Sequence, residues 1–269
     1  MSAVLGHQAV RATMAQPPLR ALVNAYPRIL YQYLGAYLAA GLPKSARREI
    51  LLAHYRYLMA RVDPSFFTRL LQDGPELWSS RRGDDVYAIR LCFTGKQHYE
   101  GDLLLEFQNN GTPLYRLSFT IAPGPLTGAS ATHALLVARI QGVKGCFEAI
   151  RHATKSCLDI APQLLLLSAV QGIAEALQIE VIAGIRNSEQ ITFNTDGATD
   201  IYFDYDAFWE AFSGVRTDRF YLIPVPFPKK PIQQINAVHR RRTRLKRRFK
   251  EGVAEDTARH FTERFLSPP

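Results

Sequence analysis

Gln141, Gly142 and Gly145 form a short glycine-containing segment between an apolar stretch and an expected helix. In that helix Arg151 and Lys155 are four residues apart, so their side chains share one helix face. Two cations beside the free N–H groups of a helix N-terminus can bind a phosphate or a carboxylate. The spacing therefore indicates an anion site. The alternative is a solvated helix face whose charges pair with a neighbouring acid.

Three side chains are candidates for proton transfer. His133 directly precedes the apolar segment 134–140, a position where acid–base residues can stand. Asp204 and Asp206 open the segment DYDAFWE, where helix capping and first-turn electrostatics are the structural alternative. A general base would also need a raised pKa in a pocket. The sequence contains no HExxH motif, zinc-ligand set, Walker loop or nucleophile elbow, so it assigns no metal site and no catalytic residue.

The segment HRRRTRLKRRFK, residues 239–250, holds eight Lys or Arg residues and no acid. Three interpretations stay open. The segment could pack on its own domain and leave its charges solvated, or it could contact an anionic membrane, a lipid headgroup or a protein partner. It could also bind nucleic acid, which is less favoured because no aromatic residues are interleaved with the cations. The candidate contact residues are Arg240, Arg241, Arg244, Arg247 and Arg248.

A narrow apolar stripe accompanies these cations. If the segment is helical, Ile235, Val238, Leu245 and Phe249 fall on one side, within roughly 80° at 100° per residue. Such a stripe predicts a seam that packs on the rest of the protein while the arginines point outward.

Composition sets the class of protein. The chain has 269 residues, of which 47% are hydrophobic and 21% charged, which is enough for a sizeable core. The formal charge is +9, and because the run at 239–250 alone supplies eight positive charges, the basicity is local. Three cysteines without a CxxC pair indicate a reducing compartment. The first residues lack a signal-peptide pattern, so we expect a soluble, cytoplasmic protein, with contact to the inner-membrane surface left open.

Hydrophobic periodicity predicts the elements that position these residues. The first part reads as helical, with helices at 19–40 and 44–62, a short helix after Asp63-Pro64, and a polar loop at 79–85. The middle reads as four strands, at 86–94, 101–108, 112–121 and 134–140. Asn109-Asn110-Gly111 forms a hairpin turn between the second and third of them, and the fourth is central.

The remaining elements alternate. We expect helices at 147–157 and 162–177, a strand at 179–184, a helix at 205–212, a strand at 220–224, a proline-rich linker, and helices at 232–250 and 253–266. This order divides the chain into an N-terminal helical segment (1–80), a mixed core (81–228) and a basic C-terminal helical extension (229–269).

The order predicts an α+β fold with a mostly antiparallel central sheet flanked by helices, and it resembles the GNAT-type acyltransferase fold. The resemblance implies that coenzyme A or an acyl carrier is bound by Gln141, Gly142, Gly145, Arg151 and Lys155. The chain departs from that pattern in three ways. No first strand is obvious, the second glycine comes four residues after Gln141, and two helices separate the loop from the next strand.

Five longer segments resemble the bacterial VirK/YbjX family. They are HYRYL (54–58), LSFTI (117–121), QGVKGCFEAIRHATKSCLDIAPQLLLLSAV (141–170), DYDAFWEAFSGV (204–215) and HRRRTRLKRR (239–248). The resemblance implies a Gram-negative bacterial cytoplasmic protein linked to virulence and to envelope resistance against antimicrobial peptides, with no assigned reaction. Where that family tends to have Gln-Gly-Pro, this chain has Gln-Gly-Val at 141–143. Two functions therefore stay open, an acyl-thioester-dependent acyltransferase and a non-enzymatic module that binds lipid or protein through its basic helix.

Overall fold

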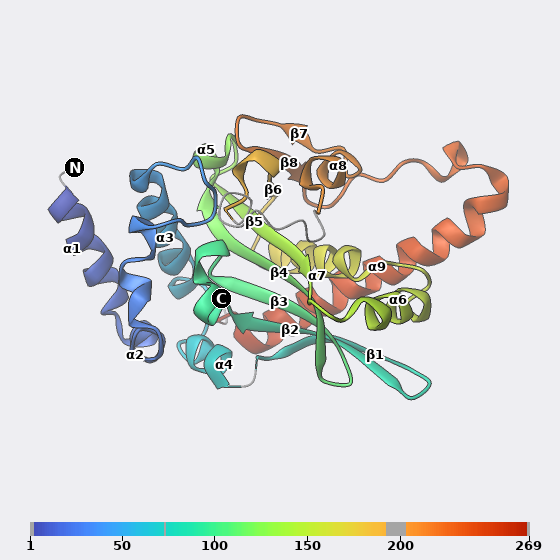
Figure 1. Cartoon of the computed structure of the whole chain (residues 1–269), viewed down its shortest axis with the longest axis horizontal. Helices are drawn as coiled ribbons and strands as arrows, with labels where there is room; N and C mark the ends of the chain where they lie inside the picture. Colours follow the sequence, from blue (N-terminus) through green and yellow to red (C-terminus); the bar gives the residue numbers. More distant parts are fainter. Residues whose placement is uncertain (1–2, 73, 192–202, 268–269) are drawn as a thin grey trace.

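A mixed sheet of eight strands forms the centre of the computed structural model, which describes residues 3–72, 74–191 and 203–267 (Figure 1). Its strand order is β1-β2-β3-β4-β5-β6-β8-β7. The strands are β1 (Glu76–Arg82), β2 (Asp85–Phe93), β3 (Leu103–Asn109), β4 (Thr112–Pro123), β5 (His133–Gly142), β6 (Val181–Ile185), β7 (Val215–Arg216) and β8 (Phe220–Pro224). Only β5 and β6 pair in parallel. The expected α+β class and the mostly antiparallel sheet are confirmed.

The hairpin and the central strand lie where the sequence predicts them. Asn109 pairs with Thr112, and Asn110 and Gly111 both have positive φ angles, of 48° and 80°. Two successive positive φ values suit the tight turn that an Asn-Gly pair favours. β5 lies between β4 and β6, and five successive residues of it, Ala134–Ala138, are buried, so both faces of the strand are covered.

The expected polar loop at 79–85 is wrong, because most of that segment belongs to strand β1. Only Leu77 and Trp78 of this strand are buried. β1 is an edge strand, and its residues 79–82 are polar, so the sequence shows no alternation of apolar and polar residues that would predict a strand. The turn that leads into β2 contains Gly83, with a φ of 63°.

The expected helix at 19–40 is also wrong. The chain instead forms α1 (Ala3–Met14), α2 (Arg20–Ala25) and short 3-10 turns. Pro27 has no backbone N–H and disfavours a helical conformation at Tyr26, so the helix ends before it. The next two expected helices are confirmed as α3 (Lys44–Met59) and α4 (Phe66–Gln72).

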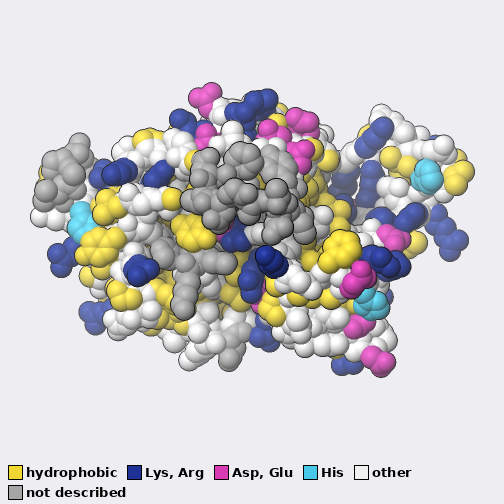
Figure 2. Space-filling model, viewed as in Figure 1, with side chains coloured by type: hydrophobic (Ala, Val, Ile, Leu, Met, Phe, Trp, Pro, Cys, Tyr) yellow, Lys and Arg dark blue, Asp and Glu magenta, His cyan; other side chains and the backbone are white. Residues whose placement is uncertain are grey.

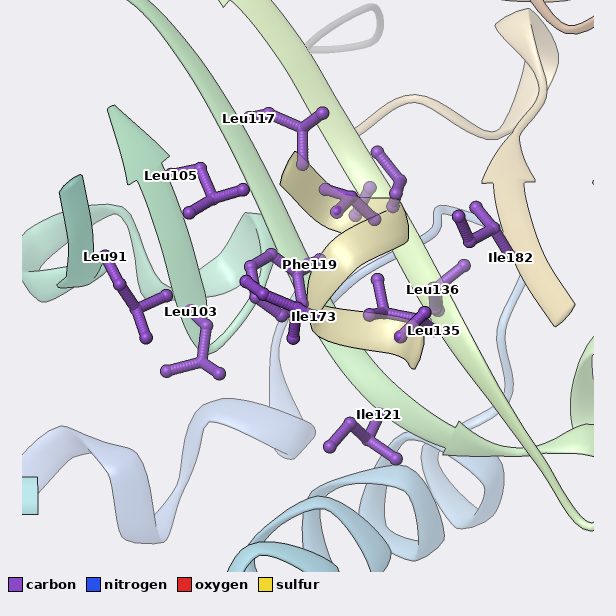
Figure 3. Packing of buried hydrophobic residues seen from close by; sticks show 14 of the residues in the cluster. Leu91, Leu103, Leu105, Leu117, Phe119, Ile121, Leu135, Leu136, Ile173 and Ile182 are labelled. Carbon is purple, nitrogen blue, oxygen red and sulfur yellow. The ribbon is translucent and has the colours of Figure 1, made fainter. Parts of the chain in front are cut away.

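The core lies between the sheet and α7 (Pro162–Ala176). Figure 3 shows Ile173 of α7 beside Phe119 of β4, with Leu91, Leu103 and Leu105 of neighbouring strands. On its other side α7 packs against α9 (Ala237–Phe265), so closely that a Cβ atom on Gly172 would lie 2.3 Å from the Ala254 carbonyl oxygen. Helix α7 is therefore covered on two sides, which explains its nearly continuous apolar sequence. The remaining helices are α5 (Gly124–Thr127), α6 (Phe147–Ser156) and α8 (Tyr205–Glu210).

The two expected C-terminal helices are one continuous helix of 29 residues, α9. Gly252 does not interrupt it, since helix propensity differs by only about 1 kcal/mol between glycine and alanine and packing outweighs that. The C-terminal half is buried through Val253, Phe261 and Phe265. The N-terminal part extends beyond the body of the protein (Figure 1), and we call residues 237–248 the basic arm.

The predicted apolar seam along this arm is only partly right. Val238 is 83% exposed and Leu245 50% exposed, so neither packs on the protein. Phe249 is half-buried, with its ring 5.9 Å from that of Trp78 and beneath the guanidinium of Arg82.

We therefore expect Phe249→Ala to lower the free energy of unfolding by about 1–2 kcal/mol, less than the cost of removing a fully buried aromatic ring. Leu245→Ala should change it by less than about 0.5 kcal/mol, because an exposed side chain loses little contact. Urea unfolding of the two variants beside the wild type measures both values. Equal losses would show that the arm packs along its whole length.

Candidate functional site

The glycine-containing segment continues strand β5. Gln141 pairs with Arg116 and Gly142 with Tyr115, and the N–H of Val143 donates to Leu114 O over 2.9 Å. The side-chain oxygen of Gln141 accepts a hydrogen bond from the guanidinium of Arg139. The backbone pairing of this segment with β4 therefore extends to Val143.

The two cations of α6 lie on its exposed side. Arg151 is within 3.7 Å of Glu148, and both side chains are more than half exposed. Lys155 is exposed as well. The ion pair with Glu148 is the arrangement expected of a solvated helix face. Whether the segment from Gln141 to Lys155 binds a cofactor stays a prediction.

The parallel pair of β5 and β6 ends early. Its last paired residues are Val137 and Gly184, although β5 continues to Gly142. Two aromatic residues of α8 bind the backbone groups beyond that point. The Tyr205 hydroxyl accepts the N–H of Ile140 over 2.9 Å, and the Trp209 indole N–H donates to Ile185 O over 2.8 Å. Tyr205 and Trp209 are fully buried, so the gap between the strands is filled at this level.

Loss of the Tyr205 hydroxyl should be measurable as loss of stability. We expect Tyr205→Phe to lower the free energy of unfolding by about 1–3 kcal/mol, because the buried Ile140 N–H would lose its acceptor. Tyr115→Phe is the matched control, since the Tyr115 hydroxyl has no hydrogen bond to the described residues. Chemical denaturation of both variants checks the difference, and equal costs would contradict the role given to Tyr205.

The candidate proton-transfer residues occupy structural positions. Asp204 accepts the N–H of Ala207 over 3.0 Å as the cap of α8, and it accepts an amide hydrogen of Asn187 over 2.9 Å. These bonds, with that of Asn187 the largest cause, lower the pKa of Asp204. Asp206 accepts the Asn187 backbone N–H over 2.9 Å. The ring of His133 lies tilted against that of Tyr57, with the centroids 4.5 Å apart, and burial lowers the pKa of His133. A general-base role for any of the three stays a prediction.

A buried polar cluster around Asp102 was not foreseen from the sequence. Asp102 is 1% exposed and accepts hydrogen bonds from four side chains. Gln32 Nε2 and Thr120 Oγ1 each donate over 2.8 Å, Tyr55 donates over 2.9 Å, and Tyr37 donates a further short bond. No Lys or Arg of the described residues pairs with this carboxylate. Burial, followed by the charge of Asp102, raises the pKa of both tyrosines, so they stay protonated and donate.

His54 lies close to this cluster and is fully buried. Strand β3 begins at Leu103, which pairs with Phe119, so the N–H of Ile121 lies beyond that ladder. It donates to His54 Nδ1 over 3.1 Å. The ring proton then resides on Nε2, which has no partner among the described residues. Burial lowers the pKa of His54, an effect opposed by Asp102. The histidine acts here as a neutral hydrogen-bond acceptor that joins α3 to β4.

The cations of the basic arm fall into two groups. Arg240 donates to the Ile235 and Gln233 carbonyls, and Arg247 donates to the Lys230 carbonyl. Arg242 pairs with Asp159 over 2.7 Å, and Lys246 donates to the Asp159 carbonyl oxygen over 2.7 Å, so both tie the arm to the loop after α6.

The other group is formed by Arg241, Arg244 and Arg248. They are exposed and have no hydrogen bond or ion pair within the described part of the chain. Figure 2 shows Lys and Arg side chains gathered along the arm and where it joins the body. The arm therefore presents unpaired positive charge beside exposed apolar side chains.

A cleft of about 320 Å³ lies at the base of the arm, between α7, the end of α8, the linker after β8, and α9. Four cations and one acid line it, together with apolar side chains. The lining residues used below are Leu164, Ala211, Phe212, Phe227, Lys229, Lys230, Arg247, Lys250 and Glu251. A second cleft, of about 410 Å³, separates α1 from α3 and carries charges of both signs. Neither cleft is lined by the residues proposed to bind coenzyme A.

No helix among the described residues has both the length and the apolar character that a bilayer crossing requires.

Comparison with known proteins identifies relatives. A family model described as "Protein of unknown function (DUF535)" matches residues 4–258. A protein of Escherichia coli (strain K12), named "Uncharacterized protein YbjX", is 28% identical over 243 residues, which cover 87% of this chain and 71% of that protein. An "Uncharacterized protein" of Haemophilus influenzae is 26% identical over 161 residues, which cover 59% of this chain and 52% of that protein. The expected resemblance to YbjX is confirmed, and both relatives are bacterial.

Proposed function

The chain belongs to the DUF535 family of proteins of unknown function, and we propose that it is a peripheral protein that binds anionic bilayers through its basic arm. The observation that supports this proposal is the group formed by Arg241, Arg244 and Arg248, which are exposed and have no acidic partner among the described residues. A role in envelope resistance, which the family resemblance implies, would fit a protein that acts at the membrane surface.

The arm has the composition of an interfacial helix. Besides its cations it carries two exposed apolar side chains, Val238 and Leu245. A helix of this kind lies along the headgroup layer, with apolar side chains inserted and cations near the phosphates. Each cation near an anionic surface contributes about 1 kcal/mol. Nucleic acid is the less favoured partner because no aromatic side chain for base stacking alternates with the cations.

Sedimentation with vesicles tests the proposal. The wild-type protein should bind vesicles that contain phosphatidylglycerol and should not bind vesicles of phosphatidylcholine alone. Added salt should release it, since screening shortens the reach of exposed charges. Binding to DNA with a steep salt dependence, but not to anionic vesicles, would instead favour a nucleic-acid binder.

Acyl transfer is a second candidate function, favoured by one observation. The only parallel strand pair of the described sheet, β5 and β6, separates next to the strand end that carries Gln141 and Gly142. The GNAT-type resemblance assigns the thioester to such a gap, with a backbone amide of the central strand polarising its carbonyl group. Here Tyr205 already occupies the amide of Ile140, so thioester binding would require its hydroxyl to move.

Coenzyme A and acyl carriers provide the test of this second candidate. Binding should raise the melting temperature of the wild type, and Arg151→Ala and Lys155→Ala should each weaken binding by about 1–3 kcal/mol, the range for hydrogen bonds to charged groups. No thermal shift with any of these compounds would leave the membrane proposal alone.

A further inference from the structure

The cleft at the base of the basic arm concentrates positive charge. Lys229 pairs with Glu251 over 2.7 Å, and the guanidinium of Arg247 donates to the Lys230 carbonyl oxygen over 2.5 Å. The ammonium groups of Lys230 and Lys250 have no hydrogen bond or ion pair within the described residues. Glu251 therefore neutralises one of the four cations that line the cleft.

Apolar side chains form part of the cleft wall. Phe212 follows α8, and its ring centroid lies 5.3 Å from that of Phe227 in the linker. Leu164 of α7 completes this wall, and all three side chains are only partly buried. The position of Phe227 is fixed by its backbone N–H, which donates to Gln171 Oε1 over 3.3 Å. The cleft thus combines apolar side chains with cations within a volume at the lower end of the range for ligand pockets.

The surroundings of Lys250 favour an anion beside it. Burial, and then the charges of Arg247, Lys229 and Lys246, lower its pKa, while Glu251 opposes them. Like charges held together in a partly desolvated place repel one another, and a bound anion relieves that repulsion.

We propose that this cleft binds one anionic amphiphile, a molecule with a phosphate or carboxylate headgroup and a single apolar chain. The headgroup would lie among Lys230, Arg247 and Lys250, and the chain would contact Phe212 and Phe227. The inference rests on the proposed function in one respect, because a bilayer bound by the arm would be the source of such molecules. Binding in the cleft itself can be measured without a membrane.

Calorimetric titration with dodecyl phosphate, kept below its micelle concentration, tests this inference. We expect saturable binding of one molecule per chain. Dodecylphosphocholine, which has the same chain and no net charge, and inorganic phosphate, which has no chain, should each bind at least tenfold more weakly. Inorganic phosphate binding as tightly as dodecyl phosphate would overturn the amphiphile class, and the absence of saturable binding would overturn the site.

Matched variants locate the site. Lys230→Ala combined with Lys250→Ala should weaken dodecyl phosphate binding at least tenfold. Arg241→Ala combined with Arg244→Ala, which removes the same charge outside the cleft, should change it less than twofold. Equal losses in the two double variants would mean that only net charge matters. Because Lys250 is partly buried, Lys230→Ala alone, at an exposed position, must also weaken binding measurably.

A third variant tests the apolar wall. Ala211 is exposed and lines the cleft, so Ala211→Trp should fill the cleft and weaken binding of dodecyl phosphate while all four cations remain. Unchanged affinity would contradict contact between the chain and this wall. If the wild type fails to bind vesicles but still binds dodecyl phosphate in the cleft, the proposed function fails and this inference stands.

Discussion

Replacement of Asp102 by alanine is expected to lower the free energy of unfolding by about 4 kcal/mol, which is an unusually large effect for one residue. The carboxylate is the common acceptor for Gln32, Tyr37, Tyr55 and Thr120. Its removal leaves four buried donors without a partner, and each unsatisfied buried group costs about 1–3 kcal/mol. Partial relaxation around the small cavity makes the lower end of that range the better estimate for each donor.

The large effect is expected because the cluster links parts of the chain that are far apart in the sequence. Gln32 and Tyr37 come from the irregular segment before α3, Tyr55 comes from α3 itself, and Thr120 comes from β4. Asp102 stands just before β3, so one carboxylate holds the N-terminal segment against the sheet. Without it, we expect the segment before α3 to open first, and hydrogen exchange of its amides should rise more than that of the central strands.

A graded series separates this network from a general effect of charge. Asp102→Asn keeps one acceptor oxygen, and its amide hydrogens can be accepted by the hydroxyls of Tyr37 and Thr120, so it should cost about half as much as alanine or less. Glu148→Ala removes a carboxylate from an exposed face of α6 and should cost less than about 0.5 kcal/mol. Urea unfolding with an unchanged slope measures all three. Equal costs for Asp102→Ala and Asp102→Asn would show that packing, not acceptance of hydrogen bonds, governs the site.

The sequence predicted correctly those elements whose conformation or burial depends mainly on their own residues. The pair Asn110-Gly111 predicts a tight hairpin turn, and the apolar run of β5 indicates burial on both faces. The same reasoning failed for β1, because an edge strand is polar on its outer side and its pairing is decided by β2. It also failed at 19–40. The apolar spacing there predicts one long helix, but in the structure the helix ends before Pro27.

Sites assembled from residues far apart in the sequence were harder to predict. Tyr205 and Trp209 could be recognised as an aromatic pair on one helix face, but their role in binding the separated ends of β5 and β6 depends on where those strands part. The cluster around Asp102 draws single residues from positions 32 to 120, so no local pattern marks it. The cleft likewise appears only when α9 folds back along α7. The exposed charge of the arm, by contrast, follows directly from a run of cations without a nearby acid.

Charge reversal of the arm should abolish binding to anionic vesicles. In the triple variant Arg241→Glu, Arg244→Glu and Arg248→Glu, the loss of three attractive charges alone removes about 3 kcal/mol at about 1 kcal/mol per cation. Since 1.4 kcal/mol corresponds to a factor of ten, vesicle affinity should fall at least about a hundredfold, and repulsion by the new carboxylates lowers it further. Stability should stay near that of the wild type because the three side chains have no partners in the described structure.

A second triple variant removes the same net charge from the other end of the molecule. Arg11, Arg20 and Arg28 are exposed on the N-terminal segment, which lies far from the arm in Figure 1. Their reversal to glutamate should reduce vesicle binding by less than about threefold, the effect expected when charges lie beyond a Debye length of roughly 8 Å from the contact. If both triple variants lose binding equally, attraction follows the charge of the whole chain and the arm is not the contact surface. If neither variant loses binding, the arginines of the arm are not the groups that meet the bilayer, and their exposure has another cause.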